Sequence, residues 1–377
     1  MEPAPTQSAT VAQTPAAPSR ADRLLSSGVM LSVVGFVSGL GNYAFQALVS
    51  RNLAASGEYG LANSALSFTG LLSLPVSIAT FAITHYIARF ALSGDDARLH
   101  NLLAGCRKFL FRLTLAGSVL AILLIKPLSD FFQFPRSSLM LVVIGTVCAG
   151  LWGAFAGALC QGLGWFRRLA LIGALAAGLR LLFGALASRW LPVAETVVAA
   201  TLVGLLANLI LLRWRRELAE HPAHPESPWT REFVGYLFVA AAFVGGGYCF
   251  TQGDALVAKR YLGGAELDGY AAAALLARAL PMTVGPLLTV LFTHRSGRRE
   301  AHDVAEQLKL LALYAGGLVA GAVALIWAHG LCLKVLGRHT PEVAAMVTPL
   351  AWTMVFVGLL QGLGMWALAS QIGRAHV

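Results

Sequence analysis

The sequence predicts an all-α polytopic membrane protein, and three observations support that fold class. Of its 377 residues, 57% are hydrophobic and only 12% are charged, whereas soluble domains carry about 25% charged residues. The mean hydropathy is +0.69. Apolar runs long enough to cross a hydrocarbon layer, which takes about 20 helical residues, recur between breaks that contain arginine. A cytosolic enzyme, a secreted disulfide scaffold and a disordered chain are therefore excluded.

Ten such runs are present, and we expect ten transmembrane helices because an open strand would leave backbone groups unsatisfied in lipid. In chain order they cover residues 28–50, 61–87, 109–125, 139–160, 169–187, 193–212, 233–251, 270–292, 310–328 and 343–368. The five cysteines are scattered without metal-type spacing, so we expect neither disulfides nor a metal site.

The segments around these runs suggest the domain organisation. Residues 1–22 are rich in Pro, Ala, Thr, Gln and Ser, which is typical of a disordered tail. Residues 23–212 hold the first six runs as one complete bundle. Residues 213–231 contain several prolines and form a linker, since proline interrupts a continuous helix. Residues 232–371 hold the other four runs.

The last six residues, 372–377, match one reading frame of a sequencing-adapter oligonucleotide. We therefore expect that they are an artefact, that the natural frame was interrupted near Gln371, and that the second bundle is truncated. The alternative is a genuine C-terminal tail.

Basic residues in alternate loops predict a cytoplasmic N-terminus, because cytoplasmic loops are enriched in Lys and Arg. The side that includes the N-terminus has about fifteen of them: Arg20, Arg23, Arg98, Arg107, Lys108, Arg167, Arg168, Arg213, Arg215, Arg216, Arg231, Arg295, Arg298, Arg299 and Lys309. The other side has about eight: Arg51, Lys126, Arg136, Arg189, Lys259, Arg260, Lys334 and Arg338. The linker at 213–231 is then cytoplasmic as well.

The first and seventh runs end in similar sequences. Residues 47–51 read ALVSR and residues 255–259 read ALVAK; Tyr59-Gly60 and Gly269-Tyr270 then open the runs that follow. Those next runs also share mid-helix prolines. We interpret this as a parallel repeat, two units related by an axis along the membrane normal, which is a transporter architecture with its cavity between the units. Convergent loop chemistry is the alternative.

The residues that open each unit resemble a known family. Arg51-Asn52-Leu53 with Gly57-Glu58-Tyr59-Gly60 is similar to the opening of the polysaccharide or O-antigen flippases of the multidrug/oligosaccharidyl-lipid/polysaccharide exporter (MOP) superfamily. Asp254, Lys259 and the Gly269-Tyr270 pair resemble the second-half signature of that family. The resemblance implies two helical bundles around a V-shaped cavity with alternating access. It also implies a monomer in a bacterial cytoplasmic (inner) membrane, acting alongside glycan polymerase and export proteins.

Arg180 and Arg278 lie near the middle of predicted spans, where an arginine costs about 2.5–3.5 kcal/mol on insertion scales. Asp254 lies at the edge of a nearby span, and one carboxylate at the outer end of that helix cannot neutralise two guanidinium groups at mid-depth. We therefore expect a cationic, water-filled cavity for an anionic lipid-linked glycan, because guanidinium binds phosphate oxygens bidentately. In the alternative, each arginine only holds backbone carbonyls or a helix break.

Other polar residues on the spans are weaker candidates. Asn42, Gln46 and Asn63 could line a sugar-binding cavity, although interhelical hydrogen bonds would explain them equally well. His85 could titrate in an ion-coupled cycle, and Asp254 could serve the same cycle or act as a counter-charge. A packing role is the alternative for His85.

The sequence also separates classes of function. It has no catalytic or nucleotide-binding motif and no long external loop, so we expect no cofactor, and an integral-membrane glycosyltransferase or polymerase is disfavoured. The basic residues flank apolar spans, which argues against nucleic acid and for membrane lipid as their surroundings. The main rival is a cation-coupled multidrug exporter of the same superfamily, which should carry membrane-embedded carboxylates for cationic drugs.

Overall fold

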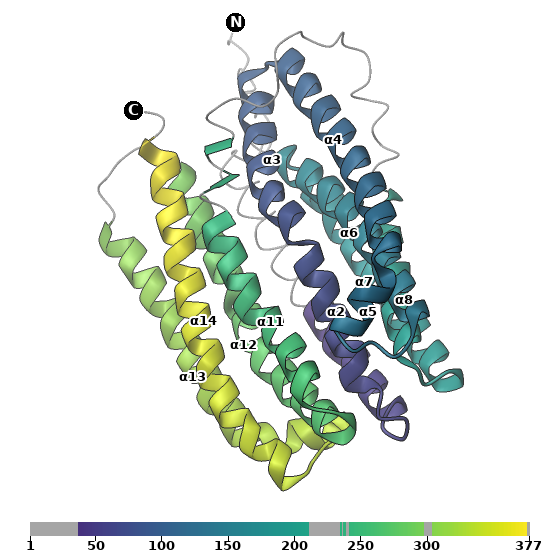
Figure 1. Cartoon of the computed structure of the whole chain (residues 1–377). Coiled ribbons are helices and arrows are strands. Elements are labelled where there is room, and N and C mark those ends of the chain that lie inside the picture. The colour runs from purple at the N-terminus through teal and green to yellow at the C-terminus, as the bar shows by residue number, and fades with distance from the viewer. Residues whose placement is uncertain (1–36, 211–233, 236, 239–240, 298–303, 375–377) are drawn as a thin grey trace, which may run out of the picture.

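The computed structural model describes residues 37–210, 234–235, 237–238, 241–297 and 304–374 and is built of helices (Figure 1). The predicted tail at 1–22 and linker at 213–231 lie outside these residues. A first helix includes residues 37–52. The later elements are α2 (Tyr59–Leu72), α3 (Leu74–Ser93), α4 (Asp96–Leu123), α5 (Ile125–Phe131), α6 (Ser137–Gly162), α7 (Phe166–Trp190), α8 (Ala194–Ala207), the π-helix η2 (Ala241–Gly245), α11 (Gly246–Tyr261), α12 (Gly264–Gly297), α13 (Val304–Leu336) and α14 (Pro341–Arg374).

Several of these helices are long and apolar enough to cross a membrane. Within the described residues there are four, namely α6, α7, Leu311–Leu336 of α13 and Pro341–Gly364 of α14. The number rises to six if the bent pairs α2 with α3 and α4 with α5 each count as one span. The chain is therefore an all-helical, multi-pass membrane protein, while the count of ten spans stays a prediction.

The second predicted span, residues 61–87, is broken in two. Helix α2 ends at Leu72, α3 begins at Leu74, and the two helices are bent by 50°. Pro75 lies in the first turn of α3, where its missing N–H does no harm but where a continuous helix would lose a backbone hydrogen bond. The proline thus sets the position of the break.

The third predicted span, residues 109–125, is the second part of a longer helix. Helix α4 begins at Asp96 because the Asp95 side chain caps it, accepting a hydrogen bond from the backbone N–H of Arg98 at 3.1 Å. The polar first turns of α4 were hidden from a search for apolar runs. At its other end α4 meets α5 at an angle of 69°.

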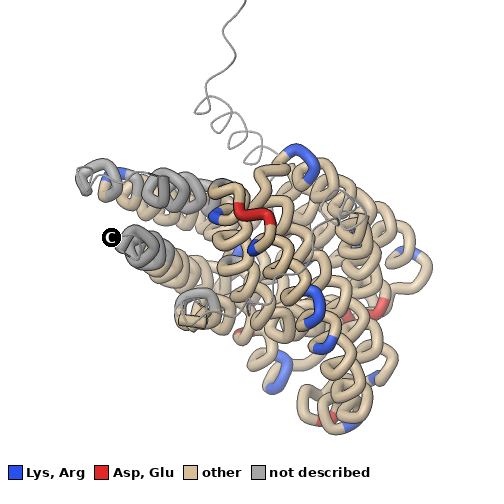
Figure 2. The backbone as a smooth tube through the Cα atoms, turned by 90° about the horizontal axis from the view of Figure 1, so that it is seen from above, with Lys and Arg blue, Asp and Glu red and all other residues tan. Residues whose placement is uncertain are grey.

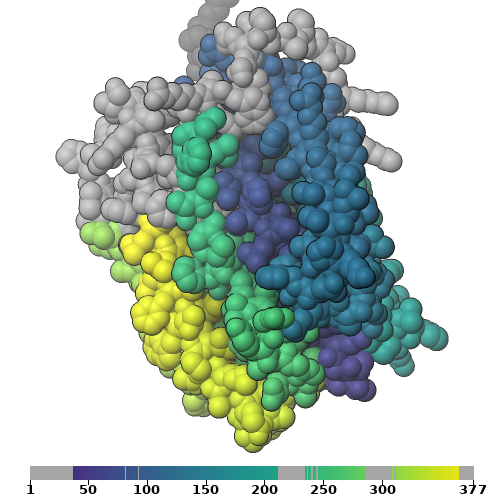
Figure 3. All heavy atoms as spheres, in the orientation of Figure 1, coloured from purple at the N-terminus to yellow at the C-terminus, as the bar shows by residue number. Residues whose placement is uncertain are grey.

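The helices form two groups (Figure 1). The first bundle consists of residues 37–52 and α2 to α8, and the second bundle consists of η2 to α14. Helix α2 of the first bundle contacts both α11 and α12 of the second. In Figure 3 the green residues of α11 lie between yellow residues of α14 and blue residues of the first bundle. The largest apolar core joins both bundles and includes Phe45, Tyr59, Ala272, Leu333 and Val347.

The outward faces of the helices carry large apolar side chains. Phe109 on α4, Leu182 on α7 and Val323 on α13 are all more than half exposed, and Trp327 is 90% exposed. Seen from above, long stretches of the described backbone carry neither acidic nor basic residues (Figure 2). Exposed apolar faces of this extent are stable in lipid and not in water.

At one end of the molecule the two bundles are joined where the backbone of Gly60 lies close to that of Leu267 and Asp268. Its backbone N–H donates to Asp268 Oδ1 at 2.6 Å. A Cβ added at Gly60 would lie 2.7 Å from the carbonyl carbon of Leu267 and 2.9 Å from the backbone nitrogen of Asp268, so only glycine permits this contact. Asp268 is fully buried, and its Oδ2 lies 2.7 Å from Arg338 Nη2.

Two further contacts join the bundles at the same end. The Ser50 hydroxyl donates to the backbone carbonyl of Leu336 at 2.9 Å, and Arg51 Nε donates to that of Val335 at 2.7 Å. The turns that precede α2, α12 and α14 meet here, at the lower end of Figure 1. We call this set of contacts the inter-bundle seam, and it comprises Ser50, Arg51, Gly60, Asp268 and Arg338.

Candidate functional site

A cavity of about 400 Å³ lies between the two bundles. Its walls come from the helical residues 37–52, α2 and α7 of the first bundle and from α11 and α12 of the second. The lining residues are Gly39, Leu40, Asn42, Tyr43, Gln46, Asn63, Leu66, Ser67, Arg180, Gln252, Leu275, Arg278, Ala279, Met282 and Thr283. The five residues that the sequence predicted for a substrate cavity, Asn42, Gln46, Asn63, Arg180 and Arg278, are all in this set.

The charge of the cavity wall has one sign. Among the described residues that line it, the charged ones are Arg180 and Arg278. The remaining polar groups are amides, hydroxyls and one phenol, which can donate to or accept from a sugar or a phosphate. A wall of this composition attracts anions and has hydrogen-bonding partners for a polar ligand.

Arg278 lies on α12 and is buried, and its partners differ from the expectation. Its Nη2 lies 2.5 Å from Oδ1 of Asp254 on α11, so the prediction that neither mid-span arginine has a carboxylate at its depth is wrong for Arg278. The reason is that α11 continues to Tyr261, which places Asp254 inside a helix and not beyond its end. A longer contact of 3.5 Å joins Arg278 Nη1 to Ser67 Oγ.

Asp254 itself is held by more than the arginine. Its Oδ2 accepts a hydrogen bond from the Tyr270 hydroxyl at 2.9 Å, and its Oδ1 accepts one from the backbone N–H of Ala255 at 2.8 Å. Asp254 is not among the residues that line the cavity. Of the two partners in this ion pair, Arg278 is the one that contributes to the cavity wall.

Arg180 on α7 is held by an amide and an aromatic ring. Its Nη1 donates to Asn42 Oδ1 at 2.7 Å, and its guanidinium carbon lies 4.3 Å from the centroid of the Phe45 ring, a cation–π arrangement. Arg180 and Asn42 also line a second cavity of about 220 Å³ inside the first bundle. These contacts position the charge of Arg180 without neutralising it.

The remaining predicted residues separate into two groups. Gln46 and Asn63 are buried, and Gln46 Oε1 lies 3.4 Å from the Tyr59 hydroxyl. His85 lies on α3, outside the set that lines the cavity, with its ring edge-on to Tyr86 at 5.3 Å between centroids. A coupling role for His85 stays a prediction, and its place in the fold does not link it to the cavity.

Sequence reasoning missed three polar residues of the site: Ser67 and Gln252, which line the cavity, and Tyr270, which donates to Asp254. Ser67 was detectable, because it follows Asn63 by four residues and residues so spaced share one face of a helix. Gln252 fell just past the predicted end of the seventh run, as did Asp254. Tyr270 was noted only as part of the repeat, and its contact with Asp254 spans the turn between α11 and α12.

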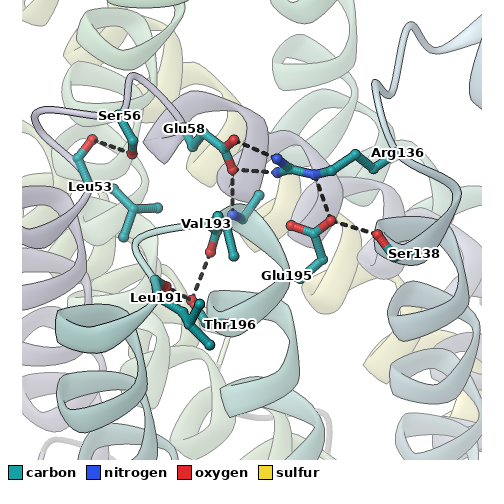
Figure 4. Close-up of polar contacts among 10 residues, drawn as sticks. Leu53, Ser56, Glu58, Arg136, Ser138, Leu191, Val193, Glu195 and Thr196 are labelled. Carbon is teal, nitrogen blue, oxygen red and sulfur yellow. Dashed lines mark hydrogen bonds and ion pairs between the residues drawn. The ribbon is translucent and has the colours of Figure 1, made fainter.

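A second polar cluster lies in the first bundle, at the end where α2, α6 and α8 begin (Figure 4). Arg136 points between Glu58 and Glu195: its Nη1 and Nη2 donate to Glu58 at 2.8 and 2.5 Å, and its Nε donates to Glu195 at 2.7 Å. Glu58 also accepts the backbone N–H of Ala194 at 2.7 Å. The cluster fastens the first residues of α2, α6 and α8 to one another.

Burial alone would raise the pKa of the Glu58 carboxyl. The hydrogen bonds from Arg136 and from the Ala194 N–H, together with the charge of Arg136, outweigh this and hold the Glu58 pKa below its ordinary value. The same hydrogen bond raises the pKa of Arg136. Both groups are therefore charged at neutral pH, and the cluster is a structural ion pair whose residues are not among those that line the cavity.

Comparison with known proteins finds no matching family model and no matching curated relative. Solved structures do match. A multidrug resistance MATE family transporter of the MOP superfamily in an outward-facing conformation has a TM-score of 0.59 and 14% identity over 94% of this chain and 84% of that chain. A structure with the same description in an inward-facing conformation has a TM-score of 0.54 and 12% identity over 92% of this chain and 88% of that chain.

A third solved structure is a MOP superfamily transporter from Pyrococcus furiosus, whose description reads that the reverse polarity of its binding pocket suggests a different function. It has a TM-score of 0.61 and 13% identity over 94% of this chain and 87% of that chain. At these identities the likeness establishes the fold alone. The chain shares the overall fold of these solved structures.

Proposed function

We propose that this protein is a transporter that flips a lipid-linked oligosaccharide, carried on a polyprenyl pyrophosphate, across the bacterial cytoplasmic membrane by alternating access. The observation that carries the proposal is the cavity wall, in which the charged side chains are Arg180 and Arg278. Asp254, which is not among the lining residues, offsets one of the two charges. An anionic head group is the ligand that such a wall stabilises.

A charged side chain inside lipid needs water or a counter-charge. An arginine at mid-helix costs about 2.5–3.5 kcal/mol on insertion scales unless it meets water or a partner. Arg180 meets an amide and an aromatic ring, which leave its net charge in place. A pyrophosphate would supply the missing counter-charge and bind the guanidinium with paired hydrogen bonds.

The inter-bundle seam supports alternating access as the mechanism. It closes the end of the molecule that carries Arg136 and Arg338, which the distribution of basic residues predicts to be external. Its contacts between the bundles are hydrogen bonds to a carboxylate and to backbone carbonyls, whose acceptors water can satisfy once the bundles separate. This structure then represents a state that is closed toward the outside.

The second candidate is a cation-coupled multidrug exporter, because MATE transporters have this fold. A cationic drug requires an acidic site, and the described residues that line the cavity include no carboxylate. The P. furiosus transporter of the same superfamily, described by its reversed pocket polarity, is a precedent for a change of substrate on this fold. An enzymatic function has no catalytic motif to support it.

Complementation of a flippase-deficient strain tests the proposal, with surface glycan measured relative to the amount of protein in the membrane. Arg278→Ala alone would leave Asp254 unpaired, so we pair it with Asp254→Asn. Loss of hydrogen bonds to a charged group is worth about 1.5–3 kcal/mol, so we expect export to fall by roughly ten- to a hundredfold. Arg278→Lys should keep part of the activity because the charge remains.

Arg112→Ala is the matched control, because Arg112 is exposed on α4 and lies outside the cavity wall. It should export glycan at the wild-type level. Arg180→Ala should show a weaker loss than the Arg278 pair of substitutions. Full export by a variant that combines Arg180→Ala with Arg278→Ala and Asp254→Asn would show that these charges are structural and that the substrate binds elsewhere.

A further inference from the structure

We infer that Asp254 is a built-in counter-ion of the empty transporter, which pairs with Arg278 when no substrate is bound and yields it to the anionic substrate on loading. This inference rests on the proposed function and names the residue that makes the transport cycle reversible. It concerns the ion pair between α11 and α12, whose Nη2 to Oδ1 distance is 2.5 Å.

The two partners of this ion pair are held unequally. Asp254 keeps two hydrogen bonds that do not involve arginine, one from the Tyr270 hydroxyl and one from the backbone N–H of Ala255. Among the described residues, the guanidinium of Arg278 is held by Asp254 and by a longer contact of 3.5 Å to Ser67. Asp254 can therefore release the guanidinium and keep its other hydrogen bonds. Arg278, by contrast, needs another anion once it has separated from Asp254.

The position of each partner fits this exchange. Arg278 lines the cavity, whereas Asp254 holds it from α11 and is not among the residues that line the cavity. A phosphate in the cavity would approach the guanidinium from the open side and compete for its N–H groups. Arg180 instead contacts Asn42 and the Phe45 ring, so of the two cavity arginines it is Arg278 that, within the described part of the chain, can alternate between an internal and an external anion.

The exchange matters because a carrier must reorient both loaded and empty. An uncompensated guanidinium inside a closing, poorly hydrated cavity opposes that movement. The substrate balances the positive charge of Arg278 when the loaded carrier reorients. Asp254 balances that charge when the empty carrier reorients. Competition by Asp254 also weakens substrate binding, which favours release on the far side.

The test uses purified full-length protein in liposomes and one probe, a C10-prenyl pyrophosphate carrying a radiolabelled N-acetylglucosamine. Three quantities are measured: equilibrium binding, exchange of internal for external probe, and net efflux into probe-free buffer. For Asp254→Asn we expect binding at least about fivefold tighter, the lower end of typical couplings between linked sites. Exchange should persist, because loaded carriers still reorient, while net efflux should fall by roughly tenfold, a coupling in the same range.

Two variants control the experiment. Glu266→Gln removes an exposed carboxylate from the same helix α12 as Arg278 and should match the wild type in all three measurements. Asp254→Glu keeps a carboxylate and should keep the wild-type ratio of net efflux to exchange. If the Asn variant does not accumulate, the Glu variant decides: loss of net efflux with retained exchange in that variant would overturn the inference.

The outcomes separate this inference from the proposed function. Equal loss of exchange and net efflux in Asp254→Asn, or unchanged or weaker binding, would show that Asp254 only supports the structure or positions Arg278. If the wild-type protein neither binds nor exchanges the probe, the proposed function fails, and the inference fails with it. If the wild type does both and the Asn variant behaves like it, only the inference fails.

Discussion

Glu58 offers a prediction at the scale of single residues, because its pairing with Arg136 has a defined dependence on pH. The Glu58 pKa is lowered in the folded protein, so the pair contributes stability above the ordinary value of 4.5 and loses it as pH falls through the lowered value. Glu58→Gln should lower the free energy of unfolding by about 1 kcal/mol at neutral pH, allowing for the partial exposure of Arg136.

Thermal unfolding midpoints in detergent measure this effect at neutral pH and at about pH 3.5, below the ordinary carboxyl range. The difference between wild type and Glu58→Gln should be present at neutral pH and should shrink in acid. Glu266→Gln, at an exposed position, should show no difference at either pH. A Glu58→Gln midpoint equal to that of the wild type at neutral pH would contradict the account of this cluster.

The residues that the sequence singled out for a cavity lie together on one cavity wall, whereas their partners were not predicted. Asn42, Gln46, Asn63 and Arg180 stand out because a polar group on an apolar helix has a cost that requires a reason. The pairing of Arg278 with Asp254 could not be predicted, because hydropathy ended the seventh run before Asp254. A helix that continues past its apolar stretch leaves no signal in composition.

At the scale of elements, the contact of α2 with α12 depends on Gly60. Gly60→Ala would place a methyl group within 2.9 Å of the backbone of Leu267 and Asp268, and backbone atoms cannot move aside as a flexible side chain can. We expect the seam to open, so the transporter should favour the state in which this end is open. Glycan export should fall because the closed state becomes rare.

Distances between spin labels at Ser56 and Glu266, both exposed near the seam, report this opening. The distribution should shift to longer distances in Gly60→Ala. Gly316→Ala on α13 is the control, since a Cβ at Gly316 meets nothing within 4 Å, and its distribution should match the wild type. Unchanged distances in Gly60→Ala would show that α2 and α12 do not act as a gate.

Element boundaries show what hydropathy resolves and what it does not. The apolar runs gave the approximate positions of α6, α7, α13 and α14, because each is one uninterrupted span. Pro75 was noticed in the second run, yet the break it causes depends on how α2 and α3 pack against other helices. The polar first half of α4 was not detected as an apolar run, because its stability comes from a cap and from packing.

For the whole molecule, the charge distribution predicts the orientation in the membrane. Reporter fusions at Arg20 and at Pro225 should behave as cytoplasmic, while fusions near Arg136 and Arg338 should behave as external. In the structure Arg136 and Arg338 are found at the end that the seam closes. An external signal from the Pro225 fusion would overturn the division into two bundles with a cytoplasmic linker.

The arrangement of two bundles around a cavity was accessible to sequence reasoning through the repeat. The similar sequences at residues 47–51 and 255–259 precede α2 and α12, and the structure places those two helices in contact. What the repeat could not give is the direction of packing or the residues at the seam. Those depend on Asp268 and Arg338, which are far apart in sequence.

Direct binding to the purified protein tests which sign of charge the cavity accepts. The wild type should bind farnesyl pyrophosphate and should not bind the lipophilic cation tetraphenylphosphonium. Binding of the pyrophosphate should weaken by roughly tenfold or more when Arg180→Ala is combined with Arg278→Ala and Asp254→Asn. Binding of tetraphenylphosphonium without binding of farnesyl pyrophosphate would contradict the account and favour the multidrug exporter.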